Sequence, residues 1–180
     1  MTGDSSVSYD DLNRLAAGVE IGSEGLNFIN FGNGAERMLV NKDPGAFFSN
    51  INFNIHSRSH LIRSVIEGVA FSFKYGVDIL KTLEINPAVI NAGNANMFLS
   101  PIFRNALSSL TGVPINLYDT DGAVGAARGA AVGAGIFKSF DEAFSGLKKI
   151  EVIEPDNKNL TKYMSAYNKW LTELNFQLNK

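Results

Sequence analysis

The residues best suited to hold a ligand lie in two turns between Val89 and Phe137, each between a predicted strand and a predicted helix. The first turn is Gly93-Asn94-Ala95-Asn96 and the second is Asp119-Thr120-Asp121-Gly122. Turns of this kind hold phosphates and nucleotides in open α/β sheets, because helix N–H groups and the positive end of the helix dipole point outward there. Small residues also let a flat or charged ligand lie against the backbone, with Asn96 as a polar contact. Spacing alone favours a plain connecting turn, and nucleotide binding is the sharper alternative.

The acidic residues of the second turn admit two interpretations. Asp119 and Asp121 could act as a general base or bind magnesium, but turn formation and N-capping of the helix that begins at Gly122 are favoured. The sequence contains no G-x-x-x-x-G-K-[ST] segment, which excludes a P-loop enzyme, and no G-x-G-x-x-G after a strand. The first turn is therefore a non-standard small turn.

Other polar residues are more simply explained by structure than by chemistry. Glu67 lies one turn after Arg63, which favours a helix-surface pair over a catalytic acid. His56 and His60 lack an H-E-x-x-H pattern, so a capping or solvated pair is favoured over a metal site. Arg37 could contact a ligand or brace its loop. The absence of cysteine excludes disulfides, thiolate zinc sites and cysteine nucleophiles. We predict no metal site in the chain.

Length and charge limit the classes of protein to consider. A chain of 180 residues fits a single domain with a sizeable core. A net charge of -2 without a basic run argues against nucleic acid or an anionic membrane as partner. No apolar run approaches the roughly 18 residues of a membrane span, and the N-terminus lacks the basic and apolar regions of a secretory signal. We therefore expect a cytoplasmic protein.

Hydrophobic spacing predicts the elements that position the two turns. The expected helices cover residues 8–22, a long segment from Ser57 to Asn86, 101–111, 122–137, 139–147 and 159–178. The expected strands cover residues 25–31, 45–53, 88–92, 113–118 and 149–153, the third of them buried and the last at a sheet edge. This alternation predicts one α/β unit.

Glycines inside the predicted helices suggest close contacts. Gly68 and Gly76 interrupt the long helix, whose predicted core stripe includes Phe73, and each costs about 1 kcal/mol relative to alanine. Gly125, Gly129 and Gly133 recur every four residues on one face of the helix after the second turn. We expect these glycines to let a sheet or a second helix approach.

Several motifs occur in the order found in one known family. They are residues 25–37, residues 43–48, the helical stretch RSHLIRSVIEGVAF at 58–71, the turn region 93–101, Gly112-Val113-Pro114, and Gly125-Ala126-Ala127 with its glycine-alanine helix. Together they resemble the FGGY carbohydrate kinases, and within that family the C-terminal domain of xylulose kinases. The resemblance covers nearly the whole chain.

The resemblance implies a fold and an activity. FGGY kinases have two ribonuclease H-like domains of the actin, hexokinase and Hsp70 type, with ATP and sugar in the cleft between them. The C-terminal domain supplies most of the adenine and phosphate pocket. Gly93-Asn94-Ala95-Asn96 would lie against the nucleotide, and the following helix start would shape the adenine pocket. The family often has a run of glycines where this chain has Ala92-Gly93-Asn94-Ala95, which weakens the expectation of close phosphate contact.

The resemblance also implies what this segment lacks. The general base of the family is an aspartate of the N-terminal half that no position here matches, and no D-x-G-[ST] phosphate loop occurs near the start. We therefore expect residues 1–180 to be most of the C-terminal nucleotide-binding domain, truncated at its N-terminal side, with no catalytic residue of its own. The expected activity of the parent is Mg²⁺- and ATP-dependent phosphorylation of D-xylulose, with the isolated segment inactive.

Two other functions stay open at the level of sequence. One is a non-enzymatic domain of the same fold that senses nucleotide or serves assembly. The other is an interaction module that uses the aromatic C-terminal helix as its surface. The sequence does not specify the sugar, because sugar contacts belong mainly to the absent half, nor does it specify the oligomeric state.

Overall fold

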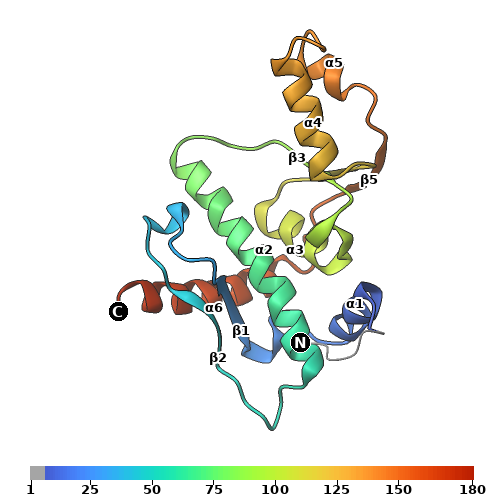
Figure 1. Ribbon diagram of the computed structural model, residues 1–180. Helices are drawn as coiled ribbons and strands as arrows, with labels where there is room; N and C mark the ends of the chain where they lie inside the picture. Colours follow the sequence, from blue (N-terminus) through green and yellow to red (C-terminus); the bar gives the residue numbers. More distant parts are fainter. Residues whose placement is uncertain (1–6) are drawn as a thin grey trace.

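The computed structural model describes residues 7–180 as a mixed α/β structure (Figure 1). The longer helices are α1 Tyr9–Ala17, α2 Arg58–Thr82, α3 Pro101–Thr111, α4 Gly122–Gly133, α5 Phe140–Phe144 and α6 Leu160–Leu178. The strands are β1 Asn27–Phe31, β2 Gly45–Ser49, β3 Ile90–Gly93, β4 Ile115–Tyr118 and β5 Lys149–Ile153. Short 3₁₀ turns are η1 Ser23–Gly25, η2 Arg37–Leu39 and η3 Asn96–Leu99. Each predicted helix and strand is present, most of them shorter than predicted.

The strands form two separate sheets. β1 and β2 make an antiparallel pair in which Asn27 lies opposite Ser49. The second sheet has the order β3-β4-β5, with β3 parallel to β4 and β5 antiparallel to β4. The prediction of an edge strand at β5 is confirmed. The prediction of a buried strand at β3 is wrong, because β3 is also an edge strand and its residues are half-buried or exposed.

The core lies where α2 and α6 meet β1. Trp170 of α6 is fully buried, and its Nε1 donates a hydrogen bond of 2.9 Å to the carbonyl oxygen of Phe28. The rings of Phe31 and Phe71 each lie 6.1 Å from that of Trp170. Tyr163 and Tyr167 are also buried, so the aromatic stripe of α6 packs inward. These aromatic side chains are therefore not available as a binding surface, which argues against an interaction module that uses them.

The long helix α2 contacts β1 closely at one glycine. A Cβ atom on Gly68 would lie 2.3 Å from the carbonyl oxygen of Phe28, so a side chain there collides with the strand backbone. The predicted close approach is confirmed at this position. It is wrong at Gly76, where no atom lies within 4 Å of the same built Cβ.

Burial along α2 differs from the predicted stripe. Phe73, assigned to the core by spacing, is 47% exposed. Polar residues one position along the helix are buried instead, among them Arg63, Glu67 and Lys74. α2 contacts α1, α3, α6 and β1, so its buried arc is set by several neighbours at once.

Arg63 and Glu67 form a buried ion pair, so the prediction of a helix-surface pair is wrong. Arg63 Nε donates to Glu67 Oε1 over 2.7 Å, and the Glu67 side chain is 1% exposed. Glu67 Oε2 also accepts a bond of 3.0 Å from the backbone N–H of Gly22, which ties α2 to the turn before β1. Burial raises the pKa of Glu67, and the Arg63 charge opposes part of that rise.

The two histidines have the predicted structural roles. His60 Nδ1 accepts a bond of 3.1 Å from the backbone N–H of Ser57 at the start of α2. His56 Nδ1 accepts a bond of 3.0 Å from the N–H of Asn52 in the preceding loop. The capping interpretation is confirmed for His60, whereas His56 braces the loop before α2.

Helices α4 and α5 lie together at one end of the molecule, away from α1 and α6 (Figure 1). No residue of α4 is buried. Nothing within 4 Å would meet a Cβ on Gly125, Gly129 or Gly133. The expectation that these glycines admit a close neighbour is therefore not met by any packing within residues 7–180.

Candidate functional site

The carboxyl ends of β3 and β4 bring the two predicted turns into contact. The strands run parallel with Gly93 opposite Tyr118, so the chain leaves both at the same edge of the sheet. The backbone N–H of Asn94 donates a bond of 2.9 Å to the carbonyl oxygen of Tyr118. A Cβ on Gly93 would lie 2.5 Å from the carbonyl oxygen of Thr120. Glycine is therefore required at position 93 for the two turns to meet.

The first turn does not lead directly into α3. The 3₁₀ turn η3 intervenes, and the buried Ser100 caps α3 by accepting a bond from the N–H of Phe103. Asn96 begins η3 with φ of 52°, a left-handed conformation that asparagine tolerates better than most residues. The positive end of the α3 dipole is thus separated from the turn, which differs from the simple strand-turn-helix prediction.

The second turn leads directly into α4. Asp121 Oδ1 accepts a bond of 2.9 Å from the backbone N–H of Val124, which confirms the predicted N-cap. Capping uses one carboxylate oxygen and leaves the other for a further contact.

Two cavities are lined by residues of the two turns. The larger has a volume of about 330 Å³ and is lined by Asn91, Ala92, Gly93, Tyr118, Thr120, Asp121, Gly122, Gly125, Phe144 and Leu147. The smaller has a volume of about 250 Å³ and is lined by Phe73, Gly93, Ala95, Asn96, Met97, Phe98 and Gly122. Gly93 and Gly122 line both, so one ligand could extend from one cavity to the other across these glycines.

The structure brings three of the predicted binding residues to the cavities. Gly93, Ala95 and Asn96 line the smaller one, whereas Asn94 lines neither and serves through its backbone bond to Tyr118. Among the described residues that line the two cavities, Asp121 is the charged one. The site is therefore small, mostly neutral, and bounded by backbone.

Sequence reasoning missed several lining residues. Phe73 comes from α2 and was assigned to the core. Phe144 and Leu147 come from the segment between α4 and β5, and nothing in their spacing links them to the turns. Asn91 in β3 also lines the larger cavity, and Asn116 Nδ2 donates a bond of 3.0 Å to its Oδ1. Of these residues, only Asn91 could have been suspected from the sequence, because it is a polar residue in a strand predicted to be buried.

A larger and more apolar cavity lies elsewhere. It has a volume of about 440 Å³ and is bounded by α1, β2, α2 and η3, with Tyr9, Phe48, Ile62 and Met97 among its lining residues. Size and apolar lining would favour it as a default site. It contains none of the predicted binding residues, and it reaches the first turn only through Met97, next to Asn96.

Residues 7–180 contain no group of three or more His, Cys, Asp or Glu side chains placed to hold a metal ion. Within the same range, no helix combines the length and the apolar character that crossing a bilayer requires.

Comparison with known proteins identifies relatives among sugar kinases, although no protein-family model matches the chain. The chain is 27% identical over 180 residues to the xylulose kinase of Haemophilus influenzae, covering 94% of this chain and 35% of that protein. It is 25% identical over 169 residues to the L-xylulose/3-keto-L-gulonate kinase of Escherichia coli, covering 91% and 32%. The crystal structure of xylulose kinase from Rhodospirillum rubrum superimposes with a TM-score of 0.72 at 26% identity, covering 96% and 35%.

The fold of these relatives is that of the actin/hexokinase-like ATPases, which confirms the predicted fold class. The chain spans about a third of the length of the relatives it matches. The sequence matches and the structural match each cover more than 90% of this chain. The chain is similar to the C-terminal part of carbohydrate kinases of the FGGY family.

Proposed function

We propose that residues 1–180 form a single domain, the nucleotide-binding C-terminal part of an ATP-dependent kinase that phosphorylates D-xylulose. The observation that carries the proposal is the contact between the two turns at Gly93, a residue that lines two cavities, in a chain related to xylulose kinases. The reaction would transfer the γ-phosphoryl group of ATP to a sugar hydroxyl, which depends mainly on positioning and charge neutralisation.

Gly93, Asn94, Ala95 and Asn96 are the proposed nucleotide-binding residues. Gly93 keeps the turns together, because a Cβ there would collide with the carbonyl oxygen of Thr120, and it lines both cavities. Asn94 holds the turn to β4 through its N–H, and Asn96 brings an amide to the smaller cavity. An amide can both donate and accept, which suits the edge of a nucleotide base.

In this part of the enzyme, the phosphate charge of the nucleotide would be neutralised mainly by the metal ion bound with it. The described residues that line the two cavities include no lysine or arginine. Mg²⁺ in kinases is held mainly by substrate phosphates with one or two carboxylates. Asp121, which lines the larger cavity, is the residue of this chain that fits such a contact. The metal would neutralise phosphate charge, while the chain holds the nucleoside.

The sugar and the general base would belong to a separate N-terminal domain of the parent enzyme. A cleft between two domains would then join the nucleotide held here to the sugar held there. The chain by itself is expected to bind nucleotide without phosphorylating D-xylulose, because it supplies one side of that cleft.

Calorimetry tests the nucleotide part of the proposal. We expect Mg-ATP and Mg-ADP to bind the purified chain, and Gly93→Ala to weaken binding roughly tenfold or more, because the added methyl must displace the turn at Thr120. Gly129→Ala is the matched control, since no atom lies within 4 Å of its built Cβ. Absence of binding at millimolar Mg-ATP contradicts the proposal.

A coupled enzyme assay tests whether the sugar site and the general base lie outside this chain. The chain alone should show no D-xylulose-dependent consumption of ATP. Sugar-dependent turnover by the isolated chain would show that the acceptor site and general base lie within it, and would overturn this part of the proposal.

A further inference from the structure

Phe73 has the helical spacing of a core residue but is 47% exposed. Its side chain lines the smaller cavity, opposite the turn formed by Gly93, Ala95 and Asn96. The residue lies on α2, far from that turn in sequence, so tertiary packing alone brings the two together. A large aromatic side chain exposed at a cavity beside a candidate ligand turn calls for an explanation other than core packing.

The orientation of the Phe73 ring is fixed by two neighbouring rings. Its centroid lies 5.5 Å from that of Phe103 at an interplanar angle of 83°, and 6.4 Å from that of Phe98 at 89°. Phe98 and Phe103 themselves meet at 5.2 Å and 88°. Phe103 is fully buried, so this edge-to-face cluster is anchored in the core. The cluster holds Phe73 in place while leaving nearly half of its surface accessible.

The chemistry of the cavity selects a flat, neutral, aromatic group. A volume of about 250 Å³ is below the roughly 300 Å³ typical of a site for a whole drug-sized ligand, and so suits part of a nucleotide. Its described lining residues carry no charge, which disfavours phosphate. Phe73 and Phe98 supply aromatic walls, Met97 a polarisable one, and Asn96 an amide.

We propose that Phe73 is the residue on which the base of the bound nucleotide stacks. The base lies in the smaller cavity between the Phe73 ring and the turn at Gly93, with the Asn96 amide at its edge. The remainder of the nucleotide passes Gly122 toward the larger cavity, which shares that glycine. Stacking accepts any base, because every base has a π-face, and it is stronger for the larger purines. This inference rests on the proposed nucleotide site and assigns its base-recognising residue.

The test separates binding of the base from binding of the phosphates. Calorimetry would compare Mg-ATP with Mg-tripolyphosphate, which lacks base and ribose, on the full chain and on Phe73→Ala and Phe73→Leu. We expect each variant to weaken Mg-ATP roughly tenfold, within the range measured for loss of one stacked base, and to leave Mg-tripolyphosphate unchanged. Phe73→Trp should retain or strengthen Mg-ATP binding.

Controls keep the result interpretable. Phe73→Leu preserves an apolar side chain of similar size, and thermal unfolding checks that each variant is folded. Phe176→Ala removes another exposed phenylalanine, 59% exposed on α6, and should not alter either affinity.

Three other outcomes would contradict the inference. Unchanged Mg-ATP affinity in both the alanine and leucine variants overturns the stacking role and leaves the nucleotide site standing. An equal loss of Mg-ATP and Mg-tripolyphosphate shows that Phe73 only supports the fold, which also overturns it. If the unmodified chain binds neither ligand, the proposed function fails and this inference fails with it.

Discussion

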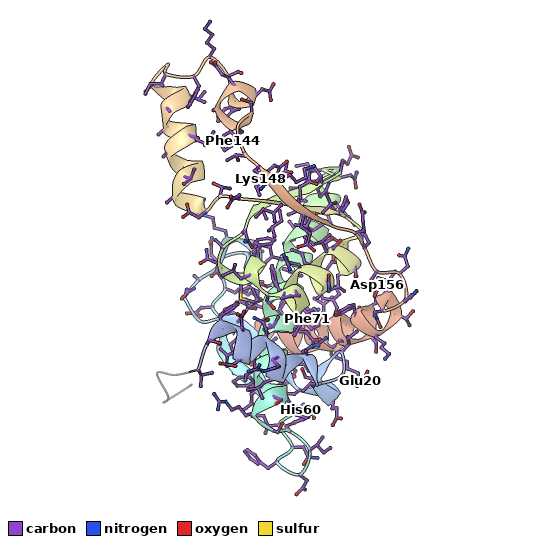
Figure 2. The ribbon with its side chains drawn as sticks, turned by 90° about the vertical axis from the view of Figure 1, so that its right-hand side faces the viewer. Glu20, His60, Phe71, Phe144, Lys148 and Asp156 are labelled. Atoms are coloured by element: carbon purple, nitrogen blue, oxygen red, sulfur yellow. The ribbon has the colours of Figure 1, made fainter. Side chains whose placement is uncertain are left out.

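Two regions of this chain are stabilised in different ways. The body, which comprises α1, β1, β2, α2, α3 and α6, buries Trp170 and Phe103 completely and contains the Arg63–Glu67 ion pair. The arm, residues 122–144 with α4 and α5, has no buried residue in α4 and only Ala143 buried in α5. Figure 2 shows Phe71 in the middle of the body and Phe144 in the arm.

The candidate site includes residues from both regions, and the body is the more rigid of the two. Phe73 and the turn at Gly93 belong to elements anchored by the body, whereas Gly122 and Phe144 belong to the arm. Asp121 caps α4 where the arm leaves the second turn, and a bond from Arg128 to the carbonyl oxygen of Ala143 joins the two helices of the arm to each other. Elements with few buried contacts open at lower free-energy cost than core elements. A ligand that touches both regions should therefore stabilise the arm more than the body.

The largest expected effect lies at the centre of the body. Trp170→Ala should lower the free energy of unfolding by about 3–5 kcal/mol, because it empties a fully buried site and leaves the Phe28 carbonyl without its donor. Urea denaturation monitored by circular dichroism measures the change. Phe176→Ala, on the exposed side of α6, should change stability by less than about 0.5 kcal/mol. A loss below about 1 kcal/mol for Trp170→Ala would contradict the assignment of the core.

The same substitution should have opposite signs in the two regions. Gly68→Ala in the body forces a methyl against the Phe28 carbonyl and should destabilise by about 1–3 kcal/mol. Gly129→Ala in the arm meets no atom within 4 Å and should stabilise its helix by about 0.5–1 kcal/mol. Unfolding midpoints give the first value, and hydrogen exchange of α4 amides gives the second. Two changes of the same sign would remove the distinction between body and arm.

The smallest effect concerns pH. Because burial raises the pKa of Glu67 above the ordinary value of 4.5, the folded chain holds this proton more tightly than the unfolded chain. The resulting stabilisation is complete below 4.5 and is lost as pH rises through the raised folded-state pKa. Wild type should therefore lose stability relative to Glu67→Gln as pH rises through that window.

Urea titrations at several pH values test this prediction. The exposed Glu154→Gln variant controls for removal of one negative charge. A difference between wild type and Glu67→Gln that does not vary with pH would show that the burial of Glu67 leaves its proton affinity unaltered.

Much of the fold follows from local pattern. Hydrophobic spacing predicts α2 and α6, and small turn residues predict the stops between strands and helices. The Asp121 cap and the His60 cap are also local, because each side chain bonds to a backbone N–H three residues away. The ordered motifs predict the family, which the comparisons support without any contribution from the coordinates.

Other features depend on contacts between distant segments. The local sequence predicts Glu67 to be a surface residue of a helix, but in the structure the turn at Gly22 covers it. The glycines of α4 read as contact residues, but the described chain provides no neighbour for them. Helical periodicity identifies the more apolar face of a helix. It does not identify the neighbouring elements that bury each residue.

The order of the elements, the two turns and the similarity to sugar kinases follow from the sequence, since these depend on residues close together in the chain. Only the tertiary structure decides that the turns touch at Gly93, that Glu67 is buried, and that Phe73 faces a cavity rather than the core. The physical reason is that burial is a property of all the elements packed around a side chain. Here those elements are separated along the chain by dozens of residues.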